Sequence, residues 1–435
     1  IEWVPVSRWE EGTILNTQLA GGTAPDICMT YGGDLVQQYA DMGGLYPLDD
    51  LLEQYGQELK AFLGPDVLQY GQYDVGEGKQ QLALCARRII IAAQTNYIRK
   101  DWLEKLNMEV PTNVEELYAY LKAAKEQNLG GTKTIPFSGD LYAADPFYNW
   151  IFPMDAFIDY DQVTEEDWIA YHDLHYALPG AKEAIRWMNK FFKSDRVNGY
   201  DGFWIGNWDA AWRMEDSFEM DLEKNVPGAS FIACDPFKPV AGTTPHETYT
   251  AAGQYLFIPA WVSEETAIAA VKYLNWMSSD EALFALQNGV EGHNYTTVDE
   301  NGIPTDLKNI NDTEDAYKIH ATDAAPICNG FYYGSDELNF AASANAYPGY
   351  SEEVMKSLAI SNDGGYQPVS FTRTIQSRVD YGATVTSKEA ELLVQAVTCK
   401  SEDFDSVWDE YLNALLSSGG QDIIDEQRAA YQEGA

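Results

Sequence analysis

A helix that ends in a glycine stop and leads into a buried strand most constrains the fold of this chain. Residues 15–27 place two glycines and then a proline behind apolar residues at helical spacing, an arrangement typical of a helix C-terminus. The S-x-x-E spacing that begins at Ser7 resembles a capping box, so the helix is predicted over 7–20. Strand-like segments over 1–6 and 26–30 flank it. Together they predict a parallel βαβ unit and an α/β fold.

Length and charge narrow the class of function. The 435 residues are enough for two or three domains, and 45% hydrophobic with 22% charged residues is an ordinary globular composition. A net charge of −40, from 68 acidic and 28 basic residues, disfavours nucleic acid and anionic membranes as partners, because both require a cationic surface. No run of 18 apolar residues is present, so no transmembrane helix is predicted.

Aromatic residues and cysteines add two further expectations. Aromatic residues make up 13% of the chain, with 12 Trp and 28 Tyr, and their side chains offer flat apolar faces with polar edges for ligand stacking. The five cysteines, at positions 28, 85, 234, 328 and 399, form no C-x-x-C pair. We therefore predict mostly buried free thiols, with a bridge between two of them left open.

Four motifs resemble those of one family and occur along the chain in the family's order. The stretch at 15–27 resembles the L-A-S-G-x-x-P-D-I signature, with Gly21 in place of the serine. Residues 96–117 resemble Y-x-R-K-D-W-L-x-K-L-x-x-x-x-P-T-T-x-x-E-L. Residues 272–281 form the third motif, and residues 289–295, the fourth, resemble G-I-E-G-x-H-Y. The chain thus resembles the extracytoplasmic solute-binding proteins, family 1, of ABC importers, and within them the large oligosaccharide-binding branch.

The resemblance implies a two-lobe periplasmic-binding-protein fold, in which discontinuous α/β lobes are joined by a hinge. The expected N-terminal lobe comprises 1–95 plus 253–325, and the second lobe 96–252 plus 326–435. A ligand that bridges the lobes favours the closed state. The resemblance also implies delivery to ABC permease subunits, no cofactor, a monomer, and a place at the surface of a Gram-positive bacterium through a lipid anchor outside this sequence. Because the chain starts at Ile1, upstream residues are expected to be missing.

Local patterns predict further elements. A β-rich apolar run predicts a strand over 88–98, and the T-x-x-E spacing at Thr112 predicts a second capping box. The remaining expected elements are a strand at 251–259 and helices over 33–41, 49–59, 387–399, 403–417 and 420–432, with another that starts at Ser263.

Ligand-binding candidates lie mainly in four segments, most of them near the ends of predicted strands, where open α/β sheets bind ligands. Asp34 has an alternative role as the cap of the following helix. The ten candidates are Tyr31, Asp34, Asp140, Tyr142, Trp150, Trp204, Asn207, Trp208, Tyr255 and Tyr332.

Trp208 is the foremost stacking candidate. The segment 206–208 resembles a family loop that presents an indole to a sugar, and 138–150 resembles a segment that supplies a carboxylate and an aromatic ring. The alternatives are structural. Tryptophans at 204, 208 and 212 have the spacing of a buried helical stripe, and Trp150 suits a helix core.

We expect a binding protein for a neutral carbohydrate, an oligosaccharide, because basic residues are scarce. A peptide or another small solute is the alternative, and an anionic sugar would need arginines such as Arg8 or Arg213. A glycoside hydrolase needs two carboxylates at a set separation, which 68 acidic residues satisfy by chance. No nucleophile elbow, H-E-x-x-H or P-loop is present, so no enzyme is expected.

No metal site is expected either. The pair His172-x-x-His175 lacks accompanying ligands, and it is interpreted as a polar segment before a helix. The stretch 127–134, where many members of the branch have a calcium loop, contains no Asp or Glu, although calcium requires six to eight oxygen ligands. Glu291 and His293 are interpreted as turn-forming residues.

Overall fold

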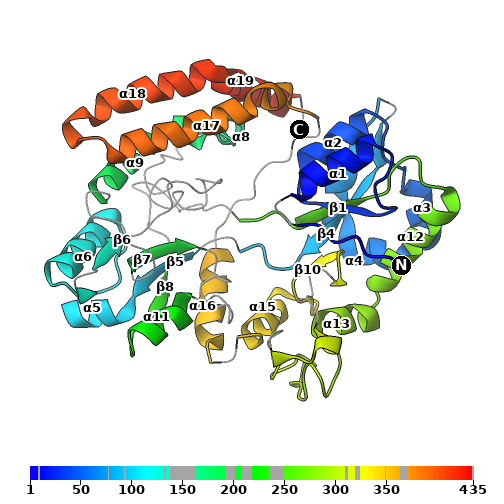
Figure 1. The fold of residues 1–435 in the computed structure, drawn as a ribbon, viewed down its shortest axis with the longest axis horizontal. Coiled ribbons are helices and arrows are strands. Elements are labelled where there is room, and N and C mark those ends of the chain that lie inside the picture. Colours follow the sequence, from blue (N-terminus) through cyan, green and yellow to red (C-terminus); the bar gives the residue numbers. More distant parts are fainter. Residues whose placement is uncertain are drawn as a thin grey trace. The chain divides into compact units, whose positions relative to one another are not determined.

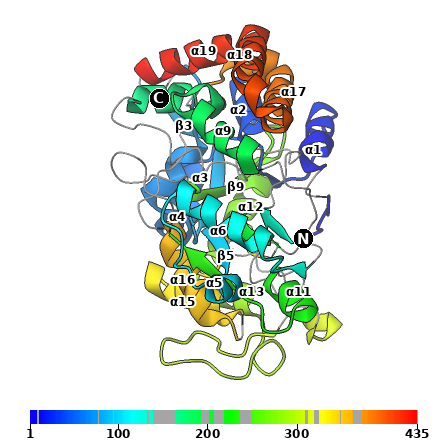
Figure 2. The same cartoon turned by 90° about the vertical axis from the view of Figure 1, so that its left-hand side faces the viewer.

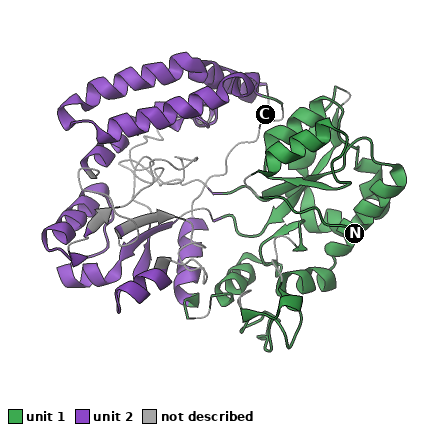
Figure 3. Ribbon diagram, in the orientation of Figure 1, with its two compact units in different colours: residues 1–91, 249–351, 372–374 green, residues 92–248, 352–371, 375–435 purple. Residues whose placement is uncertain are grey.

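The chain forms two compact units (Figure 3). The computed structural model describes residues 1–7, 10–76, 78–92, 95–131, 134–137, 163–191, 201–206, 218–235, 248–308, 312–318, 324–347, 349–362, 371 and 373–433. Unit 1 comprises Ile1–Ile91, Tyr249–Ser351 and Thr372–Thr374, and unit 2 comprises Ala92–Thr248, Glu352–Phe371 and Ile375–Ala435. Within the described residues, no helix has both the length and the apolar character that a membrane span requires.

A four-stranded sheet lies at the centre of unit 1, in the order β1-β9-β4-β10 (Figure 1). The strands are β1 (Cys28–Thr30), β9 (Ala252–Phe257), β4 (Ala83–Arg88) and β10 (Cys328–Asn329). β9 is antiparallel to both neighbours, whereas β10 is parallel to β4. The strands β1, β4 and β10 therefore run in one direction, and their carboxyl ends meet at one edge. We call the residues that end or directly follow these three strands the carboxyl edge.

Helices cover the sheet of unit 1. Its core groups leucines of α3, α4 and α12 with residues of β4 and β9, and a second cluster joins α1 and α2 to β1. Asn275 of α12 accepts hydrogen bonds from the backbone N of Glu58 and Leu59, at 2.9 and 3.1 Å, and so caps α4. The elements are α1 (Glu11–Ala20), α2 (Gly33–Asp41), α3 (Asp49–Tyr55), α4 (Gln57–Leu68), β2 (Gln72–Asp74), β3 (Lys79–Gln81), α12 (Glu264–Met277), α13 (Asp280–Asn288) and α15 (Asp336–Asn345).

The predicted N-terminal βαβ unit is wrong. Residues 1–7 adopt no regular structure, and β1 pairs with the antiparallel β9. The expected capping box does not form, because the backbone N of Glu10 donates to the Ser7 carbonyl at 3.0 Å and the helix starts only at Glu11. The large apolar side chains of this segment, such as Trp3, are exposed, so no burial selects a strand there.

Three other local predictions need correction. The predicted strand 88–98 is interrupted, since β4 ends at Arg88 and β5 starts at Thr95. The helix expected over 49–59 divides at Gly56 into α3 and α4. The second capping box does not form as predicted: Asn113, not Thr112, caps the helix by accepting from the backbone N of Glu116, while Glu116 accepts from the backbone N of Thr112 at 2.8 Å.

Predictions from strong local signals are confirmed. The helix α2 spans the predicted 33–41, β9 lies within 251–259, and Ser263 caps α12 through the backbone N of Thr266. The sequence Asp-Glu-Asn-Gly at 299–302 predicts a hairpin turn, and the turn forms: Asp299 accepts hydrogen bonds from the backbone N of Asn301 and Ile303. The cysteines are free thiols, four buried and Cys399 half-buried.

Unit 2 has a second four-stranded sheet, in the order β6-β7-β5-β8. In the same unit, the long helix α17 packs against both α18 and α19 (Figure 2). α17 is longer than predicted because Glu426 of α19 accepts from the backbone N of Gln376 and Ser377, which caps its first turn. The elements are β5 (Thr95–Arg99), α5 (Lys100–Leu106), α6 (Val114–Glu126), β6 (Ile135–Phe137), α8 (Glu165–Ala170), α9 (Ala181–Phe191), β7 (Asp201–Gly206), α11 (Phe218–Asn225), β8 (Phe231–Cys234), α16 (Ser351–Asn362), α17 (Gln376–Thr398), α18 (Phe404–Leu415) and α19 (Gln421–Gln432).

The units group the chain differently from the expected lobes at 92–95, 249–252, 326–351 and 372–374. Residues 326–351 were expected in the second lobe, but they belong to unit 1, where β10 pairs with β4. Residues 372–374 also belong to unit 1, and the Thr374 hydroxyl donates to Asp41 of α2 at 2.7 Å. The lobe boundaries themselves stay a prediction.

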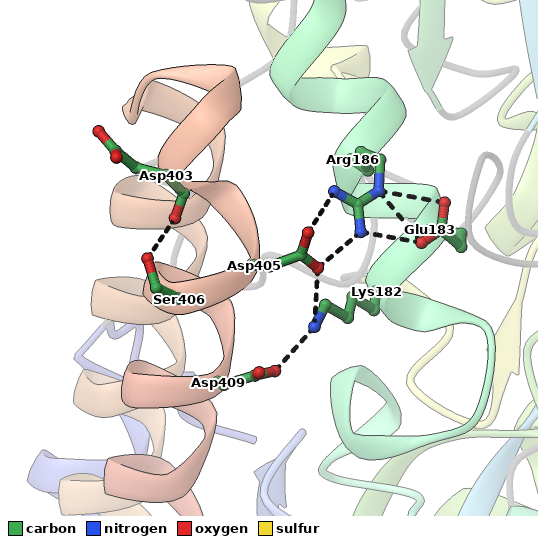
Figure 4. A network of polar contacts seen from close by, with 7 residues as sticks. All are labelled: Lys182, Glu183, Arg186, Asp403, Asp405, Ser406 and Asp409. Carbon is green, nitrogen blue, oxygen red and sulfur yellow. Dashed lines mark hydrogen bonds and ion pairs between the residues drawn. The ribbon is translucent and has the colours of Figure 1, made fainter.

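Two ion-pair sites of unit 2 differ in burial. Arg99, whose side chain is 1% exposed, donates to both carboxylate oxygens of Asp101, at 2.6 and 2.8 Å. In contrast, an exposed network joins α9 to α18 (Figure 4), where Asp405 accepts from Lys182 and Arg186. Removing one partner of the buried pair would leave the other partner's charge inside the protein, without a counter-charge and away from water.

The interpretation of the segment from His172 to His175 as polar is wrong at His175, whereas His172 is half-buried. His175 is completely buried and stacks on Trp168 with ring centroids 4.2 Å apart, and His172 approaches it edge-on at 6.0 Å. Burial lowers the pKa of both imidazoles, which keeps them neutral inside unit 2.

Glu219 of α11 is expected to make unit 2 less stable as the pH rises. Its carboxylate accepts from the backbone N of Phe231 at 2.9 Å, and burial, followed by the nearby Glu223 and Glu353, raises its pKa from 4.5 to about 7. The folded protein therefore retains a proton that the unfolded chain releases, so stability falls between about pH 4.5 and 7. Glu219→Gln keeps an acceptor for Phe231, and should raise the free energy of unfolding by roughly 1–2 kcal/mol at about pH 8 and hardly at all at about pH 4.5.

Urea unfolding at both pH values measures this effect. Asp221→Asn, at an exposed position of the same helix, is the matched control and should leave the pH dependence unchanged. Equal stabilisation by Glu219→Gln at both pH values would contradict the assigned protonation.

Candidate functional site

Four of the ten candidate residues lie at or beside the carboxyl edge of unit 1. Tyr31 directly follows β1 and is 36% exposed. The helix α2 begins at Gly33, two residues after Tyr31, and Asp34 lies in its first turn. Tyr255 lies on β9, opposite Thr30 of β1. Tyr332 follows β10 at the far side of the sheet.

Tyr31, Asp34 and Tyr255 come from adjacent elements. The Tyr255 ring packs on the backbone of Gly33, where an added Cβ would lie only 3.0 Å from the phenol oxygen. Burial raises the pKa of Tyr255, and nearby Cys85 and Asp34 raise it further. The Tyr255 phenol therefore stays protonated as a donor close to an acidic acceptor, at the start of a helix. A phenol and a carboxylate together offer the donor and acceptor that a hydroxyl-rich ligand requires.

Tyr332 is half-buried and packs against the core of unit 1. Its ring lies edge-on to Phe62 of α4, with centroids 5.2 Å apart, and its backbone N donates to Gln287 at 3.2 Å. In the sheet β4 lies between β9 and β10, so Tyr332 is separated from the other three candidates.

Sequence reasoning missed Arg88, the last residue of β4. Its guanidinium lies 4.2 Å from the centroid of the Tyr249 ring, and its backbone N donates to Ala251 at 2.8 Å. The missing signal was the strand end itself, since the predicted strand continued through this position. Asn329, which ends β10, donates to the fully buried Gln254 at 3.3 Å.

The other six candidates belong to unit 2. Trp204 lies on β7, with its backbone opposite Tyr97 of β5. Asp140, Tyr142, Trp150, Asn207 and Trp208 lie outside the described residues, as do Arg8 and Arg213. Their roles stay predictions.

No metal centre is evident in the part of the chain that the structure describes, where no three His, Cys, Asp or Glu side chains group suitably. Glu291 pairs with Tyr295 in an isolated bridge, and His293 stacks on Tyr317 with centroids 3.6 Å apart. Both contacts fit a turn-forming role.

The fold and the sequence together define the class of this protein. The chain belongs to the family of bacterial extracellular solute-binding proteins, whose profile matches residues 1–301. Proteins of this family are binding components of transporters rather than enzymes.

Particular relatives are more distant. The chain is 28% identical over 142 residues to the fructooligosaccharide ABC transporter substrate-binding protein FusA of Streptococcus pneumoniae, which is 28% of this chain and 25% of that protein. The match thus spans about a quarter of the curated relative's length.

Solved structures share the two-domain fold, which confirms the predicted fold class. A human-milk-oligosaccharide (HMO) binding solute-binding protein from Bifidobacterium longum infantis has a TM-score of 0.66 at 17% identity, covering 99% of this chain and 92% of that one. The alginate-binding protein AlgQ2 has a TM-score of 0.62 at 19% identity, covering 96% and 88%.

Proposed function

We propose that this protein captures a neutral oligosaccharide for an ABC importer, with the carboxyl edge of unit 1 as part of its binding site. The observation that carries the proposal is the grouping of Tyr31, Asp34 and Tyr255 around the start of α2. A sugar ring stacks on an aromatic face while its hydroxyls donate to a carboxylate and accept from a phenol.

The relatives support a carbohydrate. FusA is a fructooligosaccharide-binding protein by name, and structural neighbours bind HMO or alginate. The net charge of −40 favours a neutral ligand over an anionic one. A peptide or another small solute remains the alternative.

The remaining parts of the proposal follow from this role. The protein delivers its ligand unchanged to permease subunits, acts as a monomer, and is held at the surface of a Gram-positive bacterium by a lipid anchor outside this sequence. Closure of two lobes on the ligand and stacking by Trp208 stay predictions.

Calorimetric titration with panels of neutral oligosaccharides, uronate oligosaccharides and peptides tests the ligand class. Fructo-oligosaccharides and milk-type oligosaccharides are the first neutral probes. Saturable binding confined to the neutral saccharides supports the proposal, and selective binding of peptides or uronates overturns it. Mass spectrometry of each ligand after incubation should show no change of mass, because turnover would indicate an enzyme.

Asp34→Asn is expected to weaken oligosaccharide binding by about tenfold, since a hydrogen bond to a charged group contributes roughly 1.5–3 kcal/mol. Calorimetry measures the loss. Asp50→Asn, at an exposed position of α3, is the matched control and should bind like the wild type. Unchanged affinity in Asp34→Asn would exclude Asp34 from the ligand site and leave it only a structural role in the first turn of α2.

A further inference from the structure

Glu11, the first residue of α1, holds the loop that follows β1. Its Oε1 accepts a hydrogen bond from the backbone N of Tyr31 at 3.0 Å and another from the Thr30 hydroxyl at 3.0 Å. Thr30 ends β1 and is 1% exposed. One carboxylate oxygen therefore fixes both the strand end and the first residue of the loop.

A second hydrogen bond carries this constraint into α2. The Thr30 hydroxyl also accepts from the backbone N of Gly32, at 3.0 Å. Gly32 is the N-cap of α2, and its carbonyl accepts from the backbone N of Leu35 at 3.2 Å. Glu11, Thr30 and Gly32 thus form a chain of contacts that ends at the turn carrying Asp34.

The helix that carries Glu11 is itself firmly placed. Leu15 and Leu19 of α1 are buried in the cluster that contains α2 and β1. The Tyr39 hydroxyl of α2 donates to the Asn16 side chain of α1 at 2.9 Å. Because α1 is anchored independently of the loop, Glu11 restrains the loop rather than following it.

Burial of the second oxygen of the Glu11 carboxylate has a free-energy cost. Oε2 is buried, and no hydrogen-bond partner for it lies within the part of the chain that the structure describes. A buried acceptor without a partner is unfavourable for the folded state. Among the described residues, the hydrogen bonds from Thr30 and Tyr31 to Oε1 offset this cost, which links the Glu11 carboxylate to the geometry of the loop.

We infer that Glu11 is a positioning residue of the ligand site: it sets the backbone of residues 30–32, and through it the placement of Tyr31 and Asp34. This inference rests on the proposed function, in which Tyr31 and Asp34 contact the oligosaccharide. Glu11 itself acts through these two residues.

Three variants test the inference by calorimetry with the oligosaccharide that the wild type binds. Glu11→Ala removes the acceptor and should weaken binding by about tenfold or more. Glu11→Gln keeps one carbonyl oxygen as the acceptor and should restore affinity to within about threefold of the wild type. Glu10→Gln is the matched control, since the Glu10 side chain caps nothing, and should bind normally.

Amide hydrogen exchange gives a second readout that does not depend on the ligand. The backbone N–H groups of Tyr31 and Gly32 should exchange faster in Glu11→Ala and at the wild-type rate in Glu11→Gln. Thr30→Val removes the contacts of the Thr30 hydroxyl to Glu11 and to Gly32 but keeps the hydrogen bond from the backbone N of Tyr31 to Glu11, so it should expose Gly32 and leave Tyr31 protected. This variant also serves if Glu11→Ala folds poorly.

The outcomes separate the two claims. If the wild type binds no saccharide, the proposed function fails, and the exchange rates still decide whether Glu11 fixes the loop. If the wild type binds but Glu11→Ala binds equally well, the positioning role is overturned. Equal weakening in Glu11→Ala and Glu11→Gln also overturns it, because the charge itself would then be needed at the ligand.

Discussion

Asp101→Asn should destabilise unit 2 by about 3–5 kcal/mol, the loss expected when one partner of a buried ion pair is removed. Arg99 would keep its charge at 1% exposure with one carboxylate oxygen replaced by an amide donor. Burial works against the charged carboxyl, yet hydrogen bonds from Arg99 and Lys105 hold the pKa of Asp101 below its usual value. The variant therefore loses an interaction that outweighs desolvation. Urea unfolding followed by tryptophan fluorescence measures the change.

The matched control lies in the exposed network between α9 and α18. Asp405 is 67% exposed and accepts from Lys182 and Arg186 (Figure 4), and solvent screens such pairs. Asp405→Asn should therefore shift the urea midpoint far less than Asp101→Asn. Similar shifts in the two variants would show that burial does not decide the strength of these pairs.

Gly71→Ala should destabilise unit 1 by about 3 kcal/mol or more, because overpacking a buried site forces the backbone to move. A Cβ at Gly71 would lie 1.9 Å from the carbonyl oxygen of Ala83 and 2.6 Å from its carbon. Both atoms belong to the backbone of β4, where the completely buried Ala83 pairs with Phe257 of β9, so the backbone cannot move without breaking that pairing. Thermal unfolding with circular dichroism measures the effect.

Gly12→Ala is the counterpart in the same unit. A Cβ there meets nothing within 4 Å, and the residue lies in α1. Alanine is the better helix former, so the variant should gain about 0.5–1 kcal/mol. A loss of stability in Gly12→Ala, or none in Gly71→Ala, would contradict the packing described for unit 1.

Elements with complete local signals were predictable from the sequence. Both α2 and α12 have an apolar face within one short stretch; α2 ends before Gly43, and α12 begins after its cap residue Ser263, so no distant contact was needed to define them. The strand predicted over 1–6 does not form, because a strand requires a neighbouring strand to pair with. The neighbour of β1 is β9, which lies more than 200 residues away in the sequence.

The residues of the candidate site likewise divide into those that local sequence signals identify and those that depend on contacts with distant residues. Tyr31 and Asp34 follow a predictable strand, and Tyr255 lies on a predicted one. Glu11 was not found because its partners are 19 and 20 residues away and belong to another element. Arg88 was not found because the break between β4 and β5 coincides with the passage from unit 1 to unit 2, where the apolar run continues without a stop signal.

The brief return of residues 372–374 to unit 1 has a practical consequence for protein engineering. The polypeptide changes unit at 91/92, 248/249, 351/352, 371/372 and 374/375. Neither half is therefore encoded by one uninterrupted stretch of DNA. Expressing one unit alone, or exchanging it with that of a homologue, therefore requires several splice junctions. A transferred unit 1 must include residues 372–374, because Thr374 donates a hydrogen bond to Asp41.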